Sequence, residues 1–172
     1  MARHILILLL IPFWASACQG NEPQHTMYDT TPIIKTEKEW LAELGPDRYR
    51  ILRQKGTEYP GTGTYDKHFK DGIYVCAGCG HSLFSSVSKF DAHCGWPSFD
   101  AAISDQAVTE KRDISQGMIR IEIVCPNCGG HLGHVFDDGP TGTGLRYCVN
   151  SLSMQFQPIT EDRTESPIKP LE

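Results

Sequence analysis

The chain has 172 residues, with 16 basic and 21 acidic side chains and a formal net charge of −5 at pH 7. This length corresponds to one ordinary domain with tails and excludes two full domains. The basic residues are scattered and do not alternate with aromatic residues, so the composition excludes a surface for phosphate backbones, and we expect no nucleic-acid partner.

The N-terminal segment has the pattern of a signal peptide. Arg3 precedes an apolar run from Ile5 to Trp14, and small residues then lead to Cys18. The run is too short to span a bilayer comfortably, and it has no polar face of the kind that a surface helix carries. We therefore expect residues 1–17 to be a signal peptide and the protein to be exported.

The small residues directly before Cys18 resemble a bacterial lipobox, in which the cysteine is acylated and becomes the new N-terminus. Ala15 departs from this pattern, which usually has leucine three residues before the cysteine. The resemblance implies lipidation of Cys18 and a lipid-anchored linker over residues 18–35. It also implies a periplasm-facing lipoprotein of the cell envelope, and Gln19 is compatible with sorting to the outer membrane.

Two short helices are predicted at the start of the folded body. Thr36-Glu37-Lys38-Glu39 is a capping-box pattern, and it directly precedes the apolar residues Trp40 and Leu44. Pro46 then suits the first turn of a second helix, which is predicted to end at Gly56.

After Gly56 the apolar period changes from that of helices to that of strands. The clearest case is 118–124, where three isoleucines alternate with Arg120 and Glu122 as in a half-buried strand. Shorter strands are predicted at 72–76, 82–84, 134–136 and 152–156, and the Gly-rich segment 138–144 is predicted to be a long turn. The folded domain is expected to cover residues 36–158, with residues 159–172 as a flexible tail.

Four of the seven cysteines form two CxxC pairs, Cys76 with Cys79 and Cys125 with Cys128. Each pair follows a strand-like run and contains turn residues, so each can fold as a tight knuckle that directs two thiolates to one point. Four such thiolates make a closed tetrahedral zinc site, and we expect one structural Zn²⁺ per chain. The long interval between Cys79 and Cys125 requires that other strands lie between the two knuckles.

Two alternatives compete with the four-thiolate site, namely disulfides within the CxxC pairs and a local zinc site that includes histidines. Export favours disulfides, although a disulfide inside a CxxC pair closes a strained ring that normally belongs to a thioredoxin-like helix start. A local zinc site would instead use Cys125, Cys128, His131 and His134. That set leaves Cys76 and Cys79 without a role, and ligands at one repeated interval close a tetrahedron poorly in a strand-like segment. Because a four-thiolate zinc has no open position, the chemistry must lie elsewhere.

Three further motifs carry a family resemblance. They are CGWPSF at 94–99, HLGHVFDDGP at 131–140 and RYCVNS at 146–151. Together with the CxxC pairs at matching spacing, they resemble methionine-R-sulfoxide reductase B from about Thr36 to Phe156. The resemblance implies a mainly β fold in which antiparallel sheets form a barrel-like body, with short N-terminal helices and a structural zinc site on the two CxxC pairs.

The resemblance also implies the reaction, which repairs oxidised methionine in proteins. Cys148 is implied as the nucleophile that attacks the sulfoxide sulfur and becomes a sulfenic acid. Cys94 is implied as the resolving thiol, which forms a disulfide with Cys148. A thioredoxin-like donor is implied as the reductant of that disulfide, acting on a protein that we expect to be a monomer.

Several other residues take roles from the same resemblance. His131, His134 and Asn150 are implied to surround the thiol, with a structural hydrogen bond as the alternative for His131. Trp96 is implied to form an apolar wall for the methionine methyl group. Phe136 is a second candidate for contact with the substrate, and the alternative for both aromatic residues is a place in the core. Arg146 could either favour the Cys148 thiolate or pair with a nearby acid, and the sequence leaves this open. His93 departs from the pattern, which usually has glycine before the resolving cysteine.

A second class of function is a zinc-knuckle binding module without turnover, in which Cys94 and Cys148 form a static disulfide or lie idle. Thiol titration separates the two classes, since only the enzyme consumes two thiols outside the zinc site for each sulfoxide reduced. The sequence favours the enzyme, because a binding module has no need for both of these thiols.

The lipobox pattern generates a direct prediction. Cys18→Ala is expected to give an unlipidated precursor that stays active in detergent-free extract, because the linker is separate from the folded body. Incorporation of a fatty-acid probe measures lipidation, with the unaltered chain as the labelled control. A Cys18→Ala protein that still takes up the probe would show that the prediction is wrong.

Overall fold

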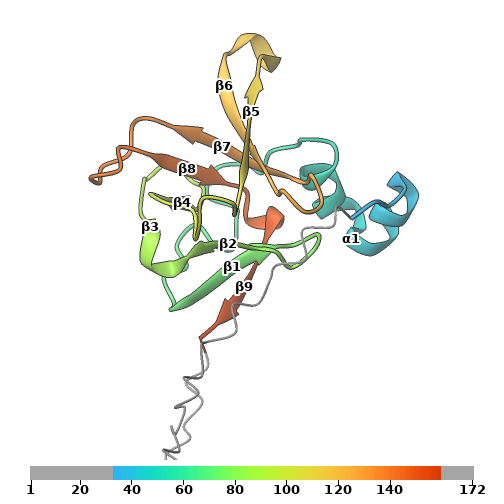
Figure 1. Ribbon diagram of the computed structural model, residues 1–172, viewed down its shortest axis with the longest axis horizontal. Helices are drawn as coiled ribbons and strands as arrows, with labels where there is room; N and C mark the ends of the chain where they lie inside the picture. The colour runs from blue at the N-terminus through green and yellow to red at the C-terminus, as the bar shows by residue number, and fades with distance from the viewer. Residues whose placement is uncertain (1–32, 160–172) are drawn as a thin grey trace, which may run out of the picture.

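The computed structural model describes residues 33–159, which form one α-helix and two antiparallel sheets (Figure 1). The predicted signal peptide, Cys18, most of the predicted linker and nearly all of the predicted tail lie outside these residues. In chain order the helix and strands are α1 (Glu37–Leu52), β1 (Gly72–Cys76), β2 (Ser82–Ser85), β3 (Lys89–Phe90), β4 (Ser98–Phe99), β5 (Thr109–Asp113), β6 (Arg120–Val124), β7 (His131–Phe136), β8 (Arg146–Val149) and β9 (Met154–Pro158).

The predicted pair of short helices is present as two halves of α1. Thr36 caps the first half, since its side chain accepts from the backbone N–H of Glu39 and the Glu39 side chain accepts from that of Thr36. The helix then breaks at Gly45, whose φ of 71° is in the left-handed region, and restarts at Pro46. Within residues 33–159, no helix combines the length and the apolar character needed to cross a bilayer.

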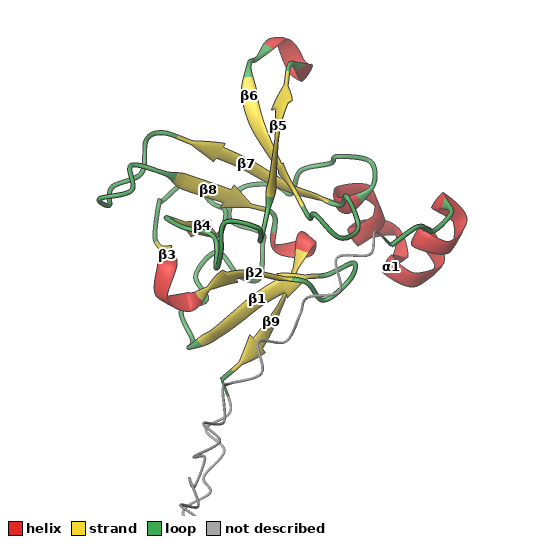
Figure 2. Ribbon diagram, viewed as in Figure 1, coloured by secondary structure: helices red, strands yellow, loops and turns green. Residues whose placement is uncertain are grey.

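The strands build a three-stranded sheet, in the order β2-β1-β9, and a six-stranded sheet, in the order β3-β4-β8-β7-β6-β5 (Figure 2). Each neighbouring pair is antiparallel. The mainly β antiparallel fold is therefore confirmed. The expected barrel-like closure is not, because the part of the chain that the structure describes keeps two open sheets, each with two edge strands.

The five predicted strands are all present, with ends that move by a few residues, as β1, β2, β6, β7 and β9. The other four were not predicted. β3 and β4 have two residues each, which is too short for a periodic pattern. β5 has the sequence TEKRD, in which no apolar residue alternates with the polar ones. It forms a strand because all five of its residues pair with β6.

Aromatic side chains fill the core between the two sheets. Phe84 of β2 stacks on Phe99 of β4 with ring centroids 4.4 Å apart, and Tyr74 of β1 meets Phe99 edge to face at 5.1 Å. Such pairs contribute about 0.5–1.5 kcal/mol each beyond the burial of their area. Phe99 ends the CGWPSF motif, so this stack anchors the segment that follows Cys94 to the core.

The hairpin of β5 and β6 projects from the body (Figure 1). Near the turn, the isoleucines of this hairpin are exposed, although Ile123, nearer the body, is fully buried in the core. Ile119 and Ile121 are 74% and 37% exposed, whereas Glu122 is 3% exposed. Glu122 of β6 therefore faces inward and is the register partner of His134 in β7, whereas β5 is largely exposed.

Candidate active site

Strand β8 brings the three motifs together. It lies between β4 and β7, and Cys148 pairs with Ser98 of the CGWPSF motif on one side. On the other side Cys148 pairs with His134 of the HLGH motif. Cross-strand partners point their side chains to the same face of a sheet, so the register sets Cys148 and His134 side by side.

The two unassigned cysteines lie close together. The sulfur atoms of Cys94 and Cys148 are 3.9 Å apart, and both residues are free thiols. A disulfide has an S–S length of about 2.05 Å, so the pair is reduced but within a short movement of bond formation. Cys94 Sγ also lies 3.5 Å from the carbonyl oxygen of Trp96 and 3.5 Å from the Ser98 hydroxyl.

Cys148 opens into a pocket of about 200 Å³. This volume is below the ~300–1,000 Å³ of pockets for drug-sized ligands, so it suits one side chain of a larger substrate. The lining residues are Thr57, Trp96, Arg120, Gly133, His134, Phe136, Cys148 and Asn150. They include five of the predicted site residues, but Cys94 and His131 are not among them. A larger hollow of about 400 Å³ lies beside Pro126 and Asn127 and contains neither thiol.

Trp96 and Asn150 are joined through the backbone of Glu58. The indole Nε1 of Trp96 donates to the Glu58 carbonyl at 3.2 Å, and the Glu58 N–H donates to the Asn150 side-chain oxygen at 3.0 Å. The Asn150 amide nitrogen donates to the carbonyl of Leu132 at 3.1 Å. Asn150 therefore lines the pocket with an amide that is held by backbone groups, and it fixes the wall formed by Trp96.

Each predicted histidine has a buried or half-buried carboxylate partner. His134 Nε2 lies 2.8 Å from Asp113 Oδ2, and His131 Nδ1 lies 2.8 Å from Glu122 Oε1. The other Glu122 oxygen accepts from the Lys55 ammonium at 2.7 Å. Burial and these hydrogen bonds act in opposite directions on Glu122, and the bonds prevail, so its pKa is below the ordinary value.

The two histidines differ in their access to the pocket. His134 lines the pocket, whereas His131 is 3% exposed and lies behind it, with the two ring centroids 5.5 Å apart. Burial lowers the pKa of His131. Asp113 and Glu122 were missed by the sequence reasoning because polar residues of a two-strand hairpin are ordinarily solvent-facing. The signal that could have found Glu122 is its alternation with isoleucines, interpreted with the polar face inward.

The environment of Cys148 disfavours its thiolate. Burial raises its pKa to about 12, with a further contribution from Cys94, and the positive charge of Arg146 opposes this increase. Arg146 is itself committed to a two-pronged pair with Asp138, with both N–O distances at 2.8 Å. Its guanidinium also stacks 4.4 Å from the ring centre of Phe136. Both roles left open for Arg146 are thus present, but burial decides the protonation state.

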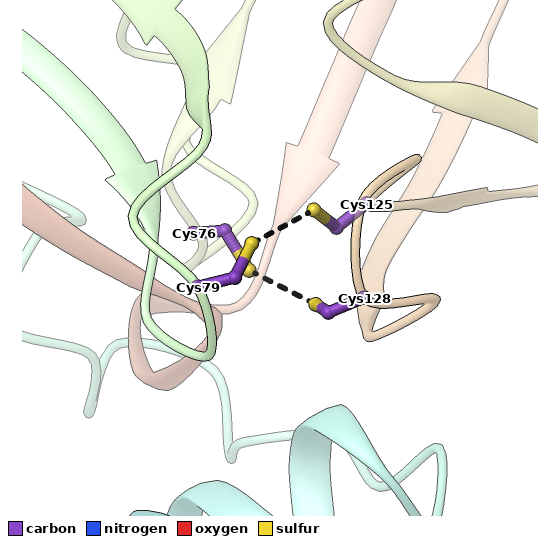
Figure 3. Close-up of side chains that lie close together, drawn as sticks. All are labelled: Cys76, Cys79, Cys125 and Cys128. Atoms are coloured by element: carbon purple, nitrogen blue, oxygen red, sulfur yellow. Dashed lines mark hydrogen bonds between the residues drawn. The ribbon is translucent and has the colours of Figure 1, made fainter. Parts of the chain in front are cut away.

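The four CxxC cysteines converge on one point (Figure 3). Their sulfur atoms all lie within 4.8 Å of one another, with Cys76 and Cys128 at 3.6 Å and Cys79 and Cys125 at 3.5 Å. Tetrahedral zinc with Zn–S bonds of ~2.3 Å would place sulfur pairs about 3.8 Å apart, so the cluster fits a closed zinc site. The alternative set with His131 and His134 is not assembled, since both rings bond to carboxylates.

The backbone around Cys94 is strained. His93 has a φ of 53° and Gly95 a φ of 91°, both in the left-handed region that favours glycine. This conformation gives a physical reason for glycine before the cysteine. His93 is held there by its backbone N–H, which donates to Asp91 at 3.0 Å, and Asp91 also pairs with Lys67 at 2.6 Å.

His93→Gly is expected to raise the free energy of unfolding by up to about 1 kcal/mol, because glycine relieves the left-handed strain. Urea denaturation measures the change. His93→Ala removes the same imidazole but keeps a Cβ, so this control is expected to give no such gain. Equal effects of the two substitutions would assign the change to the imidazole and contradict the strain argument.

Cys79→Ser is expected to lose the bound metal and to lower the free energy of unfolding by several kcal/mol, because a structural zinc site supplies folding free energy. Elemental analysis and thermal melting measure the two effects. Cys94→Ser is the matched control, since it changes a cysteine outside the cluster and should keep the metal. A Cys79→Ser protein with full metal content and unchanged melting would contradict the four-thiolate assignment.

Comparison with known proteins agrees with the motifs. Residues 44–158 match the SelR domain. The peptide methionine sulfoxide reductase MsrB of Acinetobacter baylyi is 54% identical over 138 residues, which cover 80% of this chain and 98% of that protein. That of Thiobacillus denitrificans is 56% identical over 129 residues, covering 75% of this chain and 98% of the relative. These matches show that the chain belongs to the SelR domain family, together with the peptide methionine sulfoxide reductases MsrB.

Proposed function

We propose that this protein reduces methionine-R-sulfoxide in oxidised proteins to methionine and so repairs oxidative damage. The observation that carries the proposal is a pair of free thiols, Cys94 and Cys148, 3.9 Å apart, of which Cys148 opens into a side-chain-sized pocket. The names of the MsrB relatives support the same reaction. A static disulfide, as in a binding module, has no use for such a pocket.

In the first step the Cys148 sulfur attacks the sulfoxide sulfur. The sulfoxide oxygen is a poor leaving group, so the reaction needs a proton donor as well as a nucleophile. Because burial keeps Cys148 protonated, its own proton can pass to the sulfoxide oxygen as the thiolate forms. The oxygen leaves methionine and is retained on Cys148 as a sulfenic acid.

Three pocket residues orient the substrate in this step. Trp96 provides an apolar wall for the methyl group, with its indole N–H committed to the Glu58 carbonyl. Arg120 offers guanidinium N–H groups to the sulfoxide oxygen, and His134 presents its imidazole ring in the same lining. A wall for the methyl group and donors for the oxygen together select one epimer at sulfur.

In the second step Cys94 attacks the sulfenic acid of Cys148. The two sulfur atoms form a disulfide, and the oxygen leaves as water. A thioredoxin-like donor then transfers two electrons and two protons and restores both thiols. One sulfoxide and two thiols thus give one thioether, one disulfide and one water. The four-cysteine cluster would hold zinc as a structural ion and takes no part in these steps.

The N-terminal pattern extends the proposal to location. A lipid on Cys18 would tether the enzyme to the cell envelope, where it would act on oxidised envelope proteins. The donor would then be a thioredoxin-like carrier outside the cytosol. This part of the proposal rests on the sequence alone, since Cys18 lies outside the described residues.

The two thiols are expected to behave differently when replaced. Cys148→Ser should abolish reduction of the R-sulfoxide, because a serine hydroxyl is a poor nucleophile toward sulfur. Cys94→Ser should release about one equivalent of methionine and then stall as a sulfenic acid. A single-turnover assay with dimedone trapping measures the product and the modified cysteine in both variants and the parent.

Recycling provides the control for the Cys94→Ser variant. A thioredoxin-like protein should largely fail to restore turnover, whereas dithiothreitol should rescue it by attacking the sulfenic acid directly. A dimedone adduct on Cys94 in the Cys148→Ser variant, with a full equivalent of methionine, would reverse the two roles. Absence of thiol loss in the parent on addition of R-sulfoxide would favour the binding module.

A further inference from the structure

We propose that Asp113 is a positioning residue for this reaction, whose carboxylate fixes the ring of His134 and the guanidinium of Arg120 at the Cys148 pocket. The effect on turnover rests on the proposed function, because it requires that His134 act on the sulfoxide. The effect on the ring of His134 does not, because it is a property of the resting protein. Asp113 itself is not a lining residue of the pocket.

One oxygen of Asp113 serves two residues of the pocket. Asp113 Oδ2 lies 2.8 Å from His134 Nε2 and accepts from the Arg120 Nη2 at 2.8 Å. His134 and Arg120 both line the pocket that contains Cys148. The side chains of Asp113 and His134 are 15% and 14% exposed, so water competes little for this contact. A single carboxylate therefore links two side chains that line the same pocket as the thiol.

The hairpin fixes the carboxylate itself. Asp113 is the last residue of β5 and is the register partner of Arg120, the first residue of β6. Its second oxygen, Oδ1, accepts from the backbone N–H of Ser115 at 2.9 Å, which closes the turn. Hydrogen bonds from the Ser115 side chain, from His134 and from the Ser115 backbone, in decreasing order of effect, hold the pKa of Asp113 well below its ordinary value. The carboxylate stays charged and acts as an acceptor only.

The contact determines which nitrogen of His134 can serve the substrate. A carboxylate can only accept, so Nε2 of His134 must carry a proton, and Nδ1 is the nitrogen left for a group in the pocket. In the tautomer with Nε2 protonated, Nδ1 is an acceptor that can take a proton from a group bound in the pocket. Without Asp113 the ring can rotate and populate the other tautomer, which presents the wrong nitrogen.

The second carboxylate of the hairpin supports this assignment by contrast. Glu122 holds His131 in the same manner, but His131 is buried behind His134 and is not among the lining residues. Of the two carboxylate–histidine pairs, only that of Asp113 reaches the pocket.

The test compares Asp113→Asn with Glu110→Gln. Both substitutions replace one carboxylate of β5 by an amide, but Glu110 is exposed and makes no contact with the histidine pair among the described bonds. Asp113→Asn is expected to lower kcat for R-sulfoxide by about 10–100-fold with KM changed by less than about 2-fold, since it removes an interaction that matters in the transition state. Glu110→Gln is expected to leave both constants unchanged, and thermal melting checks that each variant is folded.

A double-mutant cycle shows whether Asp113 acts through His134. In a His134→Gln background, Asp113→Asn is expected to lower kcat by a clearly smaller factor than in the parent, because His134 is already absent and only the contact with Arg120 remains to be lost. An equal loss in both backgrounds would overturn the proposal, since Asp113 would then act independently of His134.

Nitrogen NMR of the imidazole rings gives a readout that needs no turnover. The parent is expected to show His134 with Nε2 protonated, and Asp113→Ala is expected to show a mixture of the two tautomers. An unchanged tautomer in Asp113→Ala would reject the role of Asp113 even if the parent is an active reductase. A parent without reductase activity would instead reject the proposed function, and the NMR result would still decide whether Asp113 orients the ring.

Discussion

The meeting of two CxxC knuckles is the constraint on which the rest of the structure depends. Cys76 ends β1 of the three-stranded sheet, and Cys125 directly follows β6 of the six-stranded sheet. The cluster therefore joins the two sheets at one point, where sequence-distant thiols lie within 4.8 Å. Because β6 enters the cluster and β7 leaves it, the same constraint sets the start of the strand that carries both histidines. The cysteine cluster thus helps to position the Cys148 pocket although it does not line that pocket.

The state of Cys148 reflects a compromise between reactivity and protection. A thiolate is the stronger nucleophile, but it is also the form that oxidants attack. Burial raises the pKa of Cys148 to about 12, and Arg146 reduces this effect without cancelling it, partly because its charge is shared with Asp138. A resting thiol that keeps its proton is unreactive toward small oxidants. In the proposed reaction, the sulfoxide oxygen of a bound substrate would be the acceptor for that proton.

The sequence predicted those features that local chemistry determines. The capping box and Gly45-Pro46 define the two halves of α1, and the CxxC spacing identified the four cysteines that converge. The sequence did not predict the features that depend on tertiary contacts. Alternation along β6 shows that two faces differ, but not which one meets water, so the inward position of Glu122 was unforeseen. Asp113 is the last residue of a strand without apolar residues, and its contacts depend on a register that only the folded hairpin reveals. Whether two sheets close into a barrel also depends on contacts between residues that are far apart in the sequence.

Disulfide formation requires that one of the two thiols move, and the structure indicates which. Cys148 lies in β8, which is bonded to β4 on one side and to β7 on the other, so its backbone is fixed by two ladders. Cys94 lies in no strand. On its N-terminal side, Asp91 is held by hydrogen bonds from Lys67 and from the His93 backbone. On its C-terminal side, β4 is anchored by the stacking of Phe99 on Phe84. The segment between these two anchors contains the left-handed residues His93 and Gly95. The sulfur atoms must approach from 3.9 Å to a bond length of about 2.05 Å, and only this short segment is free of ladder bonds that such a movement would break. Of the two thiols, Cys94 therefore has the less constrained backbone and Cys148 the more constrained one.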